Sequence, residues 1–293
     1  MNAATGVVRR YGTERLELGE GARWVGDSLY LVDLLAGRLL VTAPAVDAVV
    51  HEVCRVNHTL GAVAPLAGKP GAWVAAVGDG VALITADDEL QWLDRPELSN
   101  PIPMRMNDAA VDPSGRFWVG SMAIDGTPDA GHLYRVDNDG SVRAVVDGLS
   151  IPNGPAFSSD GRQLYLADSA KGRIDRLDID PASGDVLSQT TFVQLTERGQ
   201  SPDGMTVDAE GCLWVAIWGG SVVHRYTADG QLDTVLAVPA RQPTSVCFGG
   251  QNGRQLFITS AYVGLLEPSD GDGAVFVSEA NVAGNPARAA VLT

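Results

Sequence analysis

The feature that most constrains the fold is a phrase that the sequence repeats six times, a glycine-containing turn followed by a strand-like segment with an aromatic residue. The six aromatic residues follow one another at intervals of 43 to 49 residues and are Tyr30, Trp73, Trp118, Tyr165, Trp214 and Phe257. Between successive copies lies a second pair of strand-like segments, usually with an Asp-rich or Asp-Gly turn. Each unit thus offers about four short strands, which at this period is typical of a β-propeller. We predict an all-β fold, a six-bladed β-propeller with four-stranded antiparallel blades around a central channel.

A β-sandwich is the alternative fold, because it too is built from many short strands. It would not, however, repeat the same phrase of turn and aromatic residue six times. No stretch has the composition of a linker between domains, and no low-complexity segment interrupts the repeat. We therefore expect residues 1–293 to form a single propeller domain. Its N-terminal strand is expected to pair with the last blade, which hides free sheet edges.

The balance of charge limits the partners of the protein. With 21 Lys and Arg against 36 Asp and Glu, the formal net charge is −15, and a field of that sign repels nucleic-acid phosphates and anionic lipid. The sequence shows no signal-peptide pattern and no apolar run of about 18 residues. We expect a cytoplasmic monomer or weak homo-oligomer that binds neither nucleic acid nor membrane. Cys54, Cys212 and Cys247 stand in apolar, strand-like sequence, which favours buried free thiols over disulfides or a thiolate metal site.

Four side chains with oxygen atoms occupy equivalent positions in their repeats. Glu20, Asn107, Asn153 and Asp203 each stand 10 to 12 residues before the aromatic residue of their repeat. In a propeller, the innermost strand of every blade starts at the same rim of the channel, so residues at equivalent positions point to one place. The spacing therefore predicts that these four side chains meet at the axis.

Two carboxylates and two amides that face one another in a narrow space favour a cation between them. Ligation by oxygen alone suits calcium, magnesium or manganese, whereas zinc sites usually recruit His or Cys. None of the histidines shares the position; they are His51, His58, His132 and His224. We predict one divalent metal ion, with Ca²⁺ favoured and Mg²⁺, Mn²⁺, Zn²⁺ or Fe²⁺ as alternatives. Taken singly, an Asn-Gly or Asp-Gly pair is more often a turn, and the coincidence of four favours the metal site.

Around these residues the sequence resembles the family of senescence marker protein (regucalcin), gluconolactonase and luciferin-regenerating enzyme. The resemblance covers nearly the whole chain and is carried by LGEGARW with LYLVD, by RMNDAAVDPSGRFWVGSM, by IPNGPAFSSDGRQLYLADS, and by SPDGMTVDAEGCLWVAIWGG with VHRYTADG. It implies a six-bladed propeller with a metal ion held by Glu20, Asn153 and Asp203, with Asn107 nearby and Arg105 reaching the substrate. It also implies a gluconolactonase-like enzyme that hydrolyses a small lactone, in the first place a sugar lactone (aldonolactone), to its hydroxy acid.

The sequence departs from the family pattern at a few points. The family usually has N-D-G where this chain has Asn107, Asp108 and Ala109, often G-T-M where Gly120, Ser121 and Met122 stand, and proline at Ala22. These changes leave the implied metal ligands intact. Residues 123–132 lie where relatives vary, so they bear on the identity of the lactone rather than on the reaction.

In the mechanism that we expect, the metal ion polarises the lactone carbonyl and activates a bound water, and Asp203 is the general base. Arg105 and Asn107 are two residues apart on one extended segment, so they point to the same side and bind oxygens of the substrate. Trp218 and Tyr262 are expected to form apolar walls. The same site could serve a metal-dependent esterase or phosphotriesterase, and a third alternative is a non-enzymatic calcium-binding propeller.

Overall fold

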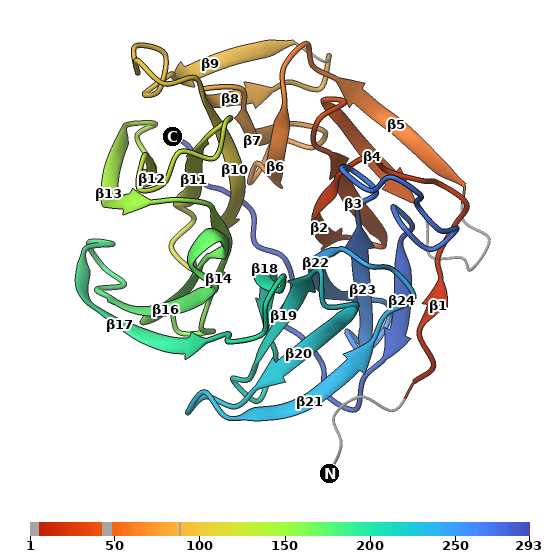
Figure 1. The fold of residues 1–293 in the computed structure, drawn as a ribbon. Helices are drawn as coiled ribbons and strands as arrows, with labels where there is room; N and C mark the ends of the chain where they lie inside the picture. Colours follow the sequence, from red (N-terminus) through yellow and green to blue (C-terminus); the bar gives the residue numbers. More distant parts are fainter. Residues whose placement is uncertain (1–5, 43–48, 88) are drawn as a thin grey trace.

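The computed structural model describes residues 6–42, 49–87 and 89–293, which form six four-stranded antiparallel sheets. Figure 1 shows these sheets as blades arranged in a ring. The predicted fold, an all-β six-bladed propeller, is confirmed. Apart from the short 3₁₀ segment η1 (Ser169–Lys171), the described residues contain no helix, and none of them forms a helix long and apolar enough to cross a membrane.

Each blade is a meander in which strands that follow one another in sequence pair side by side, with the first strand nearest the axis. Blade 1 consists of β2 (Gly19–Val25), β3 (Ser28–Asp33), β4 (Arg38–Thr42) and β5 (Val50–Arg55). Blade 2 consists of β6 (Leu60–Pro65), β7 (Trp73–Val77), β8 (Gly80–Ile84) and β9 (Leu90–Asp94). Blade 3 consists of β10 (Met104–Val111), β11 (Phe117–Ala123), β12 (Gly131–Val136) and β13 (Val142–Leu149).

The other three blades complete the ring. Blade 4 consists of β14 (Pro152–Phe157), β15 (Gln163–Asp168), β16 (Arg173–Ile179) and β17 (Val186–Gln194). Blade 5 consists of β18 (Ser201–Val207), β19 (Leu213–Trp218), β20 (Val222–Tyr226) and β21 (Leu232–Ala237). Blade 6 consists of β22 (Pro243–Gly249), β23 (Gln255–Ser260), β24 (Phe276–Glu279) and, from the start of the chain, β1 (Arg9–Arg10).

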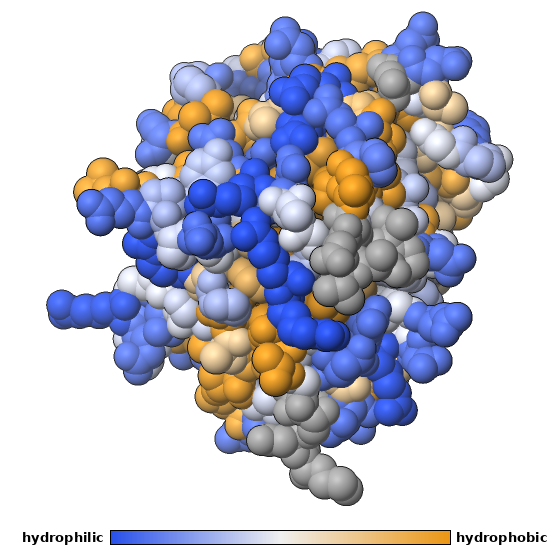
Figure 2. Space-filling model, turned by 90° about the vertical axis from the view of Figure 1, so that its right-hand side faces the viewer, coloured by the Kyte–Doolittle hydropathy of each residue, from blue (hydrophilic) through white to orange (hydrophobic). Residues whose placement is uncertain are grey.

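The ring is closed by pairing between the two ends of the chain. β1 pairs antiparallel with β24, which places Arg9 opposite Val277 and Arg10 opposite Phe276. The predicted closure of the last blade by the N-terminal strand is therefore confirmed. Figure 2 shows hydrophilic residues over much of the side of the ring where β1 lies, with smaller apolar areas between them.

The repeated aromatic phrase has a structural explanation in blades 3 and 5. One carboxylate oxygen of Asp112 accepts a hydrogen bond from the backbone N–H of Ser114 (2.8 Å) and fixes the turn, while the other accepts one from the indole N–H of Trp118 (3.1 Å). Asp208 accepts the indole N–H of Trp214 in the same way, at 2.9 Å. Both indole rings are fully buried, so each aspartate satisfies the one polar atom of a core side chain.

The apolar core lies between neighbouring blades. The ring of Trp118 packs edge-on against Phe157 of blade 4, with the ring centres 5.5 Å apart. Trp214 packs in the same manner against Phe248 of blade 6, at 5.7 Å. The three cysteines are buried and none of them is in a disulfide, as predicted. In blades 3 and 5 the aromatic residue of the repeat thus packs against the inner strand of the next blade and helps to fix its position in the ring.

The innermost strands share an irregularity at equivalent positions. Their pairing with the second strand is interrupted after Glu20 in β2, Met106 in β10, Asn153 in β14 and Pro202 in β18. The inner strands β6 and β22 are interrupted in the same way. A bulge of this kind bends the strand and changes the direction of its side chains. The residues predicted to meet at the axis therefore lie at these bulges or directly beside them.

The C-terminal residues 283–293 cross the axis at the end of the channel where the inner strands finish. Figure 1 shows this segment running across the middle of the ring. It is held by the backbone N–H of Ala209 in blade 5, which donates to Ala283 (2.9 Å), and by the N–H of Ala290, which donates to Pro65 in blade 2 (2.8 Å). The segment thus covers one end of the channel.

Candidate active site

A cavity of about 230 Å³ lies at the end of the channel where the inner strands begin. Its deeper lining residues are Glu20, Asn107, Asn153 and Asp203. Its upper lining residues stand two positions earlier in the chain, at or just before the start of the inner strands, and are Leu18, Arg105, Ile151 and Ser201. The remaining wall is formed by Met122, Ser169, Ala170 and Trp218. We call the first set the deep tier and the second set the upper tier.

The deep tier contains the four side chains that occupy equivalent positions in the sequence repeats. The structure brings all four into this one cavity, and each residue is only 4 to 5% exposed. Side chains two positions apart in a strand point to the same side, which explains why Arg105 of the upper tier lies above Asn107.

Glycine directly follows three of the four deep-tier residues, and at two of these positions the backbone conformation gives a steric reason for it. Gly21 and Gly154 have φ angles of +57° and +52°, a backbone conformation that side chains with a Cβ rarely adopt. A Cβ on Gly154 would lie only 2.7 Å from the carbonyl oxygen of Asp203 in the neighbouring inner strand. The glycine therefore allows β14 and β18 to approach closely enough for Asn153 and Asp203 to share one cavity.

A chain of hydrogen bonds orients the polar side chains. Arg105 Nη1 donates to Asn107 Oδ1 (2.6 Å), and Asn107 Nδ2 donates both to Asn153 Oδ1 (2.6 Å) and to the carbonyl of Pro152 (2.9 Å). Asn153 Nδ2 donates to Ser169 Oγ (3.0 Å), and that hydroxyl donates to the carbonyl of Pro202 (2.6 Å). The network crosses blades 3, 4 and 5 and turns the Asn153 carbonyl oxygen away from Ser169.

Burial dominates the electrostatics of the cavity. It raises the pKa of Glu20 well above its usual range, and the nearby Asp203 and Asp108 raise it further. Burial likewise raises the pKa of Asp203 well above its usual range, with Asp108 adding to the effect. Burial lowers the pKa of Arg105 to about 10, against the opposing influence of Glu20 and Asp203. Arg105 thus stays cationic at neutral pH. Its single positive charge does not offset the burial of the two nearby carboxyl groups, Glu20 and Asp203.

The residues present fit a bound divalent cation. Asp203 Oδ1 is buried and has no hydrogen-bond partner within the described part of the chain. A buried polar oxygen without a partner is costly unless a cation or a donor satisfies it. Glu20 accepts a bond from the backbone N–H of Gly21 (3.2 Å) and leaves its other oxygen available. Carboxylate and amide oxygens without His or Cys are the donors that hard cations such as Ca²⁺ and Mg²⁺ prefer.

Of the two aromatic residues that were expected to form walls of the cavity, one lines it and the other does not. Trp218 lines the cavity, as expected. Tyr262 is not among the lining residues; its ring lies instead 5.5 Å from the guanidinium of Arg15. The expectation for Tyr262 was therefore wrong, because the connection between β23 and β24 carries this ring toward the N-terminal segment.

Sequence reasoning missed Ser169 and most of the upper tier. Ser169 lies in η1, outside the repeated phrase, and no local signal identifies its contact with Asn153. Ile151 and Ser201 could have been found, because they stand two residues before Asn153 and Asp203 and strand alternation places them on the same side.

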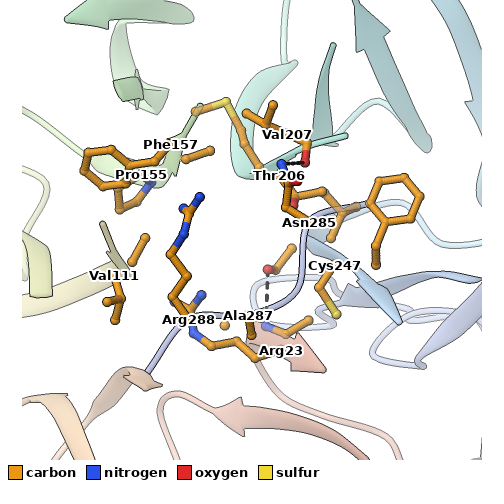
Figure 3. Close-up of a pocket in the computed structure, with 18 of the residues that line it drawn as sticks. Arg23, Val111, Pro155, Phe157, Thr206, Val207, Cys247, Asn285, Ala287 and Arg288 are labelled. Carbon is orange, nitrogen blue, oxygen red and sulfur yellow. Dashed lines mark hydrogen bonds between the residues drawn. The ribbon is translucent and has the colours of Figure 1, made fainter. Parts of the chain in front are cut away.

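A second cavity, of about 90 Å³, lies at the opposite end of the channel. Figure 3 shows Arg288 of the C-terminal segment projecting into it, with Arg23 nearby. Arg23 lies 3.9 Å from the buried Asp108, and Asp108 also accepts the backbone N–H of Gly154 (2.9 Å). The charge of Asp108 is thus already balanced by Arg23 and by backbone N–H donors. This cavity is therefore a poorer site for a divalent ion than the deep tier.

One further acidic cluster lies on the outside of the channel in blade 5. Asp208, Glu210 and Cys212 have potential ligand atoms within 4.8 Å of one another. Arg225 Nη2 lies 2.8 Å from Asp208 and 2.6 Å from Glu210, so an arginine already neutralises these carboxylates. Its presence explains the cluster as an ion-pair network of the blade.

Fold and cavity together define a class of protein, β-propellers that carry an oxygen-donor centre at one end of their axis. The chain belongs to the SMP-30/Gluconolactonase/LRE-like family, whose sequence model matches residues 18–262. This membership confirms the resemblance on which the interpretation of the motifs rests.

Comparison with individual proteins gives the same assignment. The chain is 35% identical over 260 residues to pentonolactonase XacC of Haloferax volcanii, covering 87% of this chain and 84% of that protein. A solved structure of luciferin-regenerating enzyme superposes with a TM-score of 0.89 at 30% identity, covering 98% of this chain and 100% of the other. A regucalcin of Agrobacterium tumefaciens, described as a calcium-binding protein, superposes with a TM-score of 0.89 at 27% identity, covering 99% of each chain.

Proposed function

We propose that this protein is a metal-dependent lactonase that hydrolyses a small lactone, in the first place an aldonolactone, to its hydroxy acid. In this proposal Glu20, Asn153 and Asp203 hold one divalent ion, for which Ca²⁺ suits the all-oxygen set best. The observation that carries the proposal is the buried oxygen of Asp203, which has no hydrogen-bond partner among the residues that the structure describes, together with the equally buried Glu20. The name of the Haloferax relative supports lactones as the substrate class.

A divalent cation in this set supplies Lewis-acid polarisation of an ester carbonyl and lowers the pKa of a bound water. The side chains of the protein supply the rest. Arg105 is cationic and lies in the upper tier, where its N–H groups can donate to the lactone oxygen on which negative charge develops. Asp203, the proposed general base, accepts a proton from the attacking water through a carboxylate oxygen.

In this proposal Asn107 contributes to substrate binding chiefly by orienting its neighbours. Both N–H groups of its amide are used by Asn153 and by the carbonyl of Pro152, and its oxygen accepts from Arg105. Asn107 therefore couples the direction of the Arg105 guanidinium to the position of Asn153. A change at Asn107 is expected to affect both substrate binding and the metal centre.

The test is pH-stat hydrolysis of several aldonolactones, before and after chelation, with separate return of calcium, magnesium, manganese, zinc and ferrous iron. We expect chelation to abolish turnover and at least one ion to restore it. Asp203→Asn should abolish turnover with the fold retained. The matched control is Asp229→Asn, because Asp229 is an exposed residue of the same blade and should leave activity unchanged.

Two other outcomes correspond to the alternative functions. Faster turnover of phosphotriesters or aryl esters than of lactones would assign the same centre to a different ester class. Tight calcium binding without turnover of any ester would favour a calcium-binding protein, the description given to the Agrobacterium neighbour. Full lactonase activity after complete metal removal would contradict the proposal.

A further inference from the structure

We propose that the cavity selects lactones with few hydroxyl groups on the part of the ring remote from the carbonyl. This inference rests on the proposed lactonase function and concerns which lactone the site prefers. Its substrate class is a deoxy-aldonolactone or an alkyl-substituted lactone rather than a fully hydroxylated sugar lactone.

The inference starts from the depth of the two tiers. The carboxylates proposed to act on the carbonyl lie in the deep tier, so the remainder of a bound lactone ring lies in the upper tier. Around the axis the upper tier alternates between apolar and polar side chains in the order Leu18, Arg105, Ile151 and Ser201. Only two of these four positions can form hydrogen bonds with a hydroxyl group.

Above the deep tier, both polar side chains of the upper tier keep hydrogen-bonding groups without a partner among the described residues. Arg105 uses one terminal nitrogen for Asn107 and Met106, and its other N–H groups have no protein partner within the described residues. The hydroxyl of Ser201 likewise has none there. Ser169, by contrast, uses its hydroxyl for both Asn153 and Pro202. A ligand beyond the deep tier thus finds two side chains, Arg105 and Ser201, with hydrogen bonds to offer.

Trp218 and Met122 make much of the remaining wall apolar. Trp218 packs against the apolar cluster that contains Leu18 and Ala261. On the other side Met122 pairs with Arg105 across β10 and β11. Just beyond this pair the backbone N–H of Ile124 donates to Pro103 (2.9 Å).

The side chain of Ile124 is 61% exposed. The apolar wall at Met122 therefore continues outward along blade 3, where an alkyl substituent of the ring could lie. A sugar hydroxyl placed against this wall, or against Leu18 or Ile151, would lose water without gaining a protein partner. An apolar wall rejects an added hydroxyl by a factor of up to about a hundred, so we expect a preference of about tenfold or more.

The experiment compares lactones that differ only in hydroxyl groups. kcat/KM is measured on the metal-loaded protein for D-ribono-1,4-lactone, its 5-deoxy counterpart and α-hydroxy-γ-butyrolactone, each divided by its rate of hydrolysis by hydroxide alone. We expect the 5-deoxy compound to exceed ribonolactone by about tenfold or more. Equal values, or a higher value for ribonolactone, would overturn the inference and leave lactonase activity standing. Absence of turnover with every lactone would refute the proposed function and this inference with it.

A variant tests the assigned cause. Met122→Gln keeps the length of the side chain and adds an amide that can bond a hydroxyl, so the preference for the 5-deoxy compound should fall several-fold. The control Leu232→Gln makes a similar change on the outer strand of blade 5, where Leu232 is 52% exposed, and should leave the preference as it is. Metal affinity measured by calorimetry should be unchanged in both variants. An unaltered preference in Met122→Gln would show that the apolar wall is not the determinant.

Discussion

The hydroxyl of Ser169 offers a sensitive test of how the candidate metal centre is held. It lies in η1, is buried, and joins Asn153 of blade 4 to the carbonyl of Pro202 in blade 5 at 3.0 and 2.6 Å. Ser169→Ala removes both hydrogen bonds without adding bulk. The Asn153 amide then loses the acceptor that fixes its orientation, and the carbonyl of Pro202, the residue directly before Asp203, loses its donor.

The structure gives the size of the expected effects. Leaving a buried amide and a buried carbonyl short of one partner should lower the free energy of unfolding by about 1 to 3 kcal/mol. Loss of a side chain that orients a metal ligand typically weakens metal binding by about 10- to 100-fold. We therefore expect a modest loss of stability in the metal-free protein together with a large loss of affinity for the divalent ion.

The assay combines calorimetric titration of Ca²⁺ and Mn²⁺ with urea unfolding in the presence of chelator. Ser245→Ala is the matched control, because the Ser245 hydroxyl also joins two inner strands, accepting the N–H of Ala22 at 3.3 Å, but lines the opposite cavity. It should change stability by a comparable amount and metal affinity little. Affinity in Ser169→Ala within about twofold of the wild type would refute the reasoning, since the expected range begins at about tenfold.

Three further predictions concern other parts of the structure. Gly154→Ala places a Cβ 2.7 Å from the Asp203 carbonyl oxygen at a φ of +52°, and urea unfolding should show that the free energy of unfolding falls by about 1 to 3 kcal/mol. The control Gly68→Ala, whose Cβ would have no atom within 4 Å, should lower it less. Burial would raise the pKa of Asp272, but Arg241 and Ser269 hold it at about 2, below the ordinary 3.8, so its stabilisation is present at neutral pH and is lost as the pH falls from about 4 to about 2. Asp272→Asn should accordingly reduce stability by roughly 2 kcal/mol at pH 7 and by much less at pH 2, and equal losses in thermal scans at the two pH values would contradict this. Deleting residues 283–293 removes the segment that covers one end of the channel. Tm should fall, while the folded protein should keep its affinity for the metal ion. Retention of the wild-type Tm would show that the segment does not stabilise the ring.

Much of the fold and the deep tier could be predicted because each repeat carries its own copy of the signal. Six similar phrases at nearly constant spacing indicate six blades, and the ring places equivalent residues at one axis. Glu20 and Asp203 are 183 positions apart in the sequence, yet their equivalent place in the repeat is enough to bring them together.

The parts that escaped prediction depend on contacts outside the repeat. Ser169 reaches Asn153 from a 3₁₀ segment that occurs in blade 4 alone among the described blades. Tyr262 stands in a long connection whose direction is set by packing against the N-terminal segment, including Arg15. Such contacts leave no periodic pattern, because each involves one blade and a distant stretch of chain.

The central claim is that the deep tier binds one divalent ion, and calorimetric titration of the chelator-treated protein tests it most directly. The wild type should bind one ion per chain and Glu20→Ala should bind none, while Glu210→Ala, which alters the arginine-paired acidic cluster of blade 5, should bind like the wild type. Failure of the wild type to bind any divalent ion, or equal binding by Glu20→Ala, would contradict the claim.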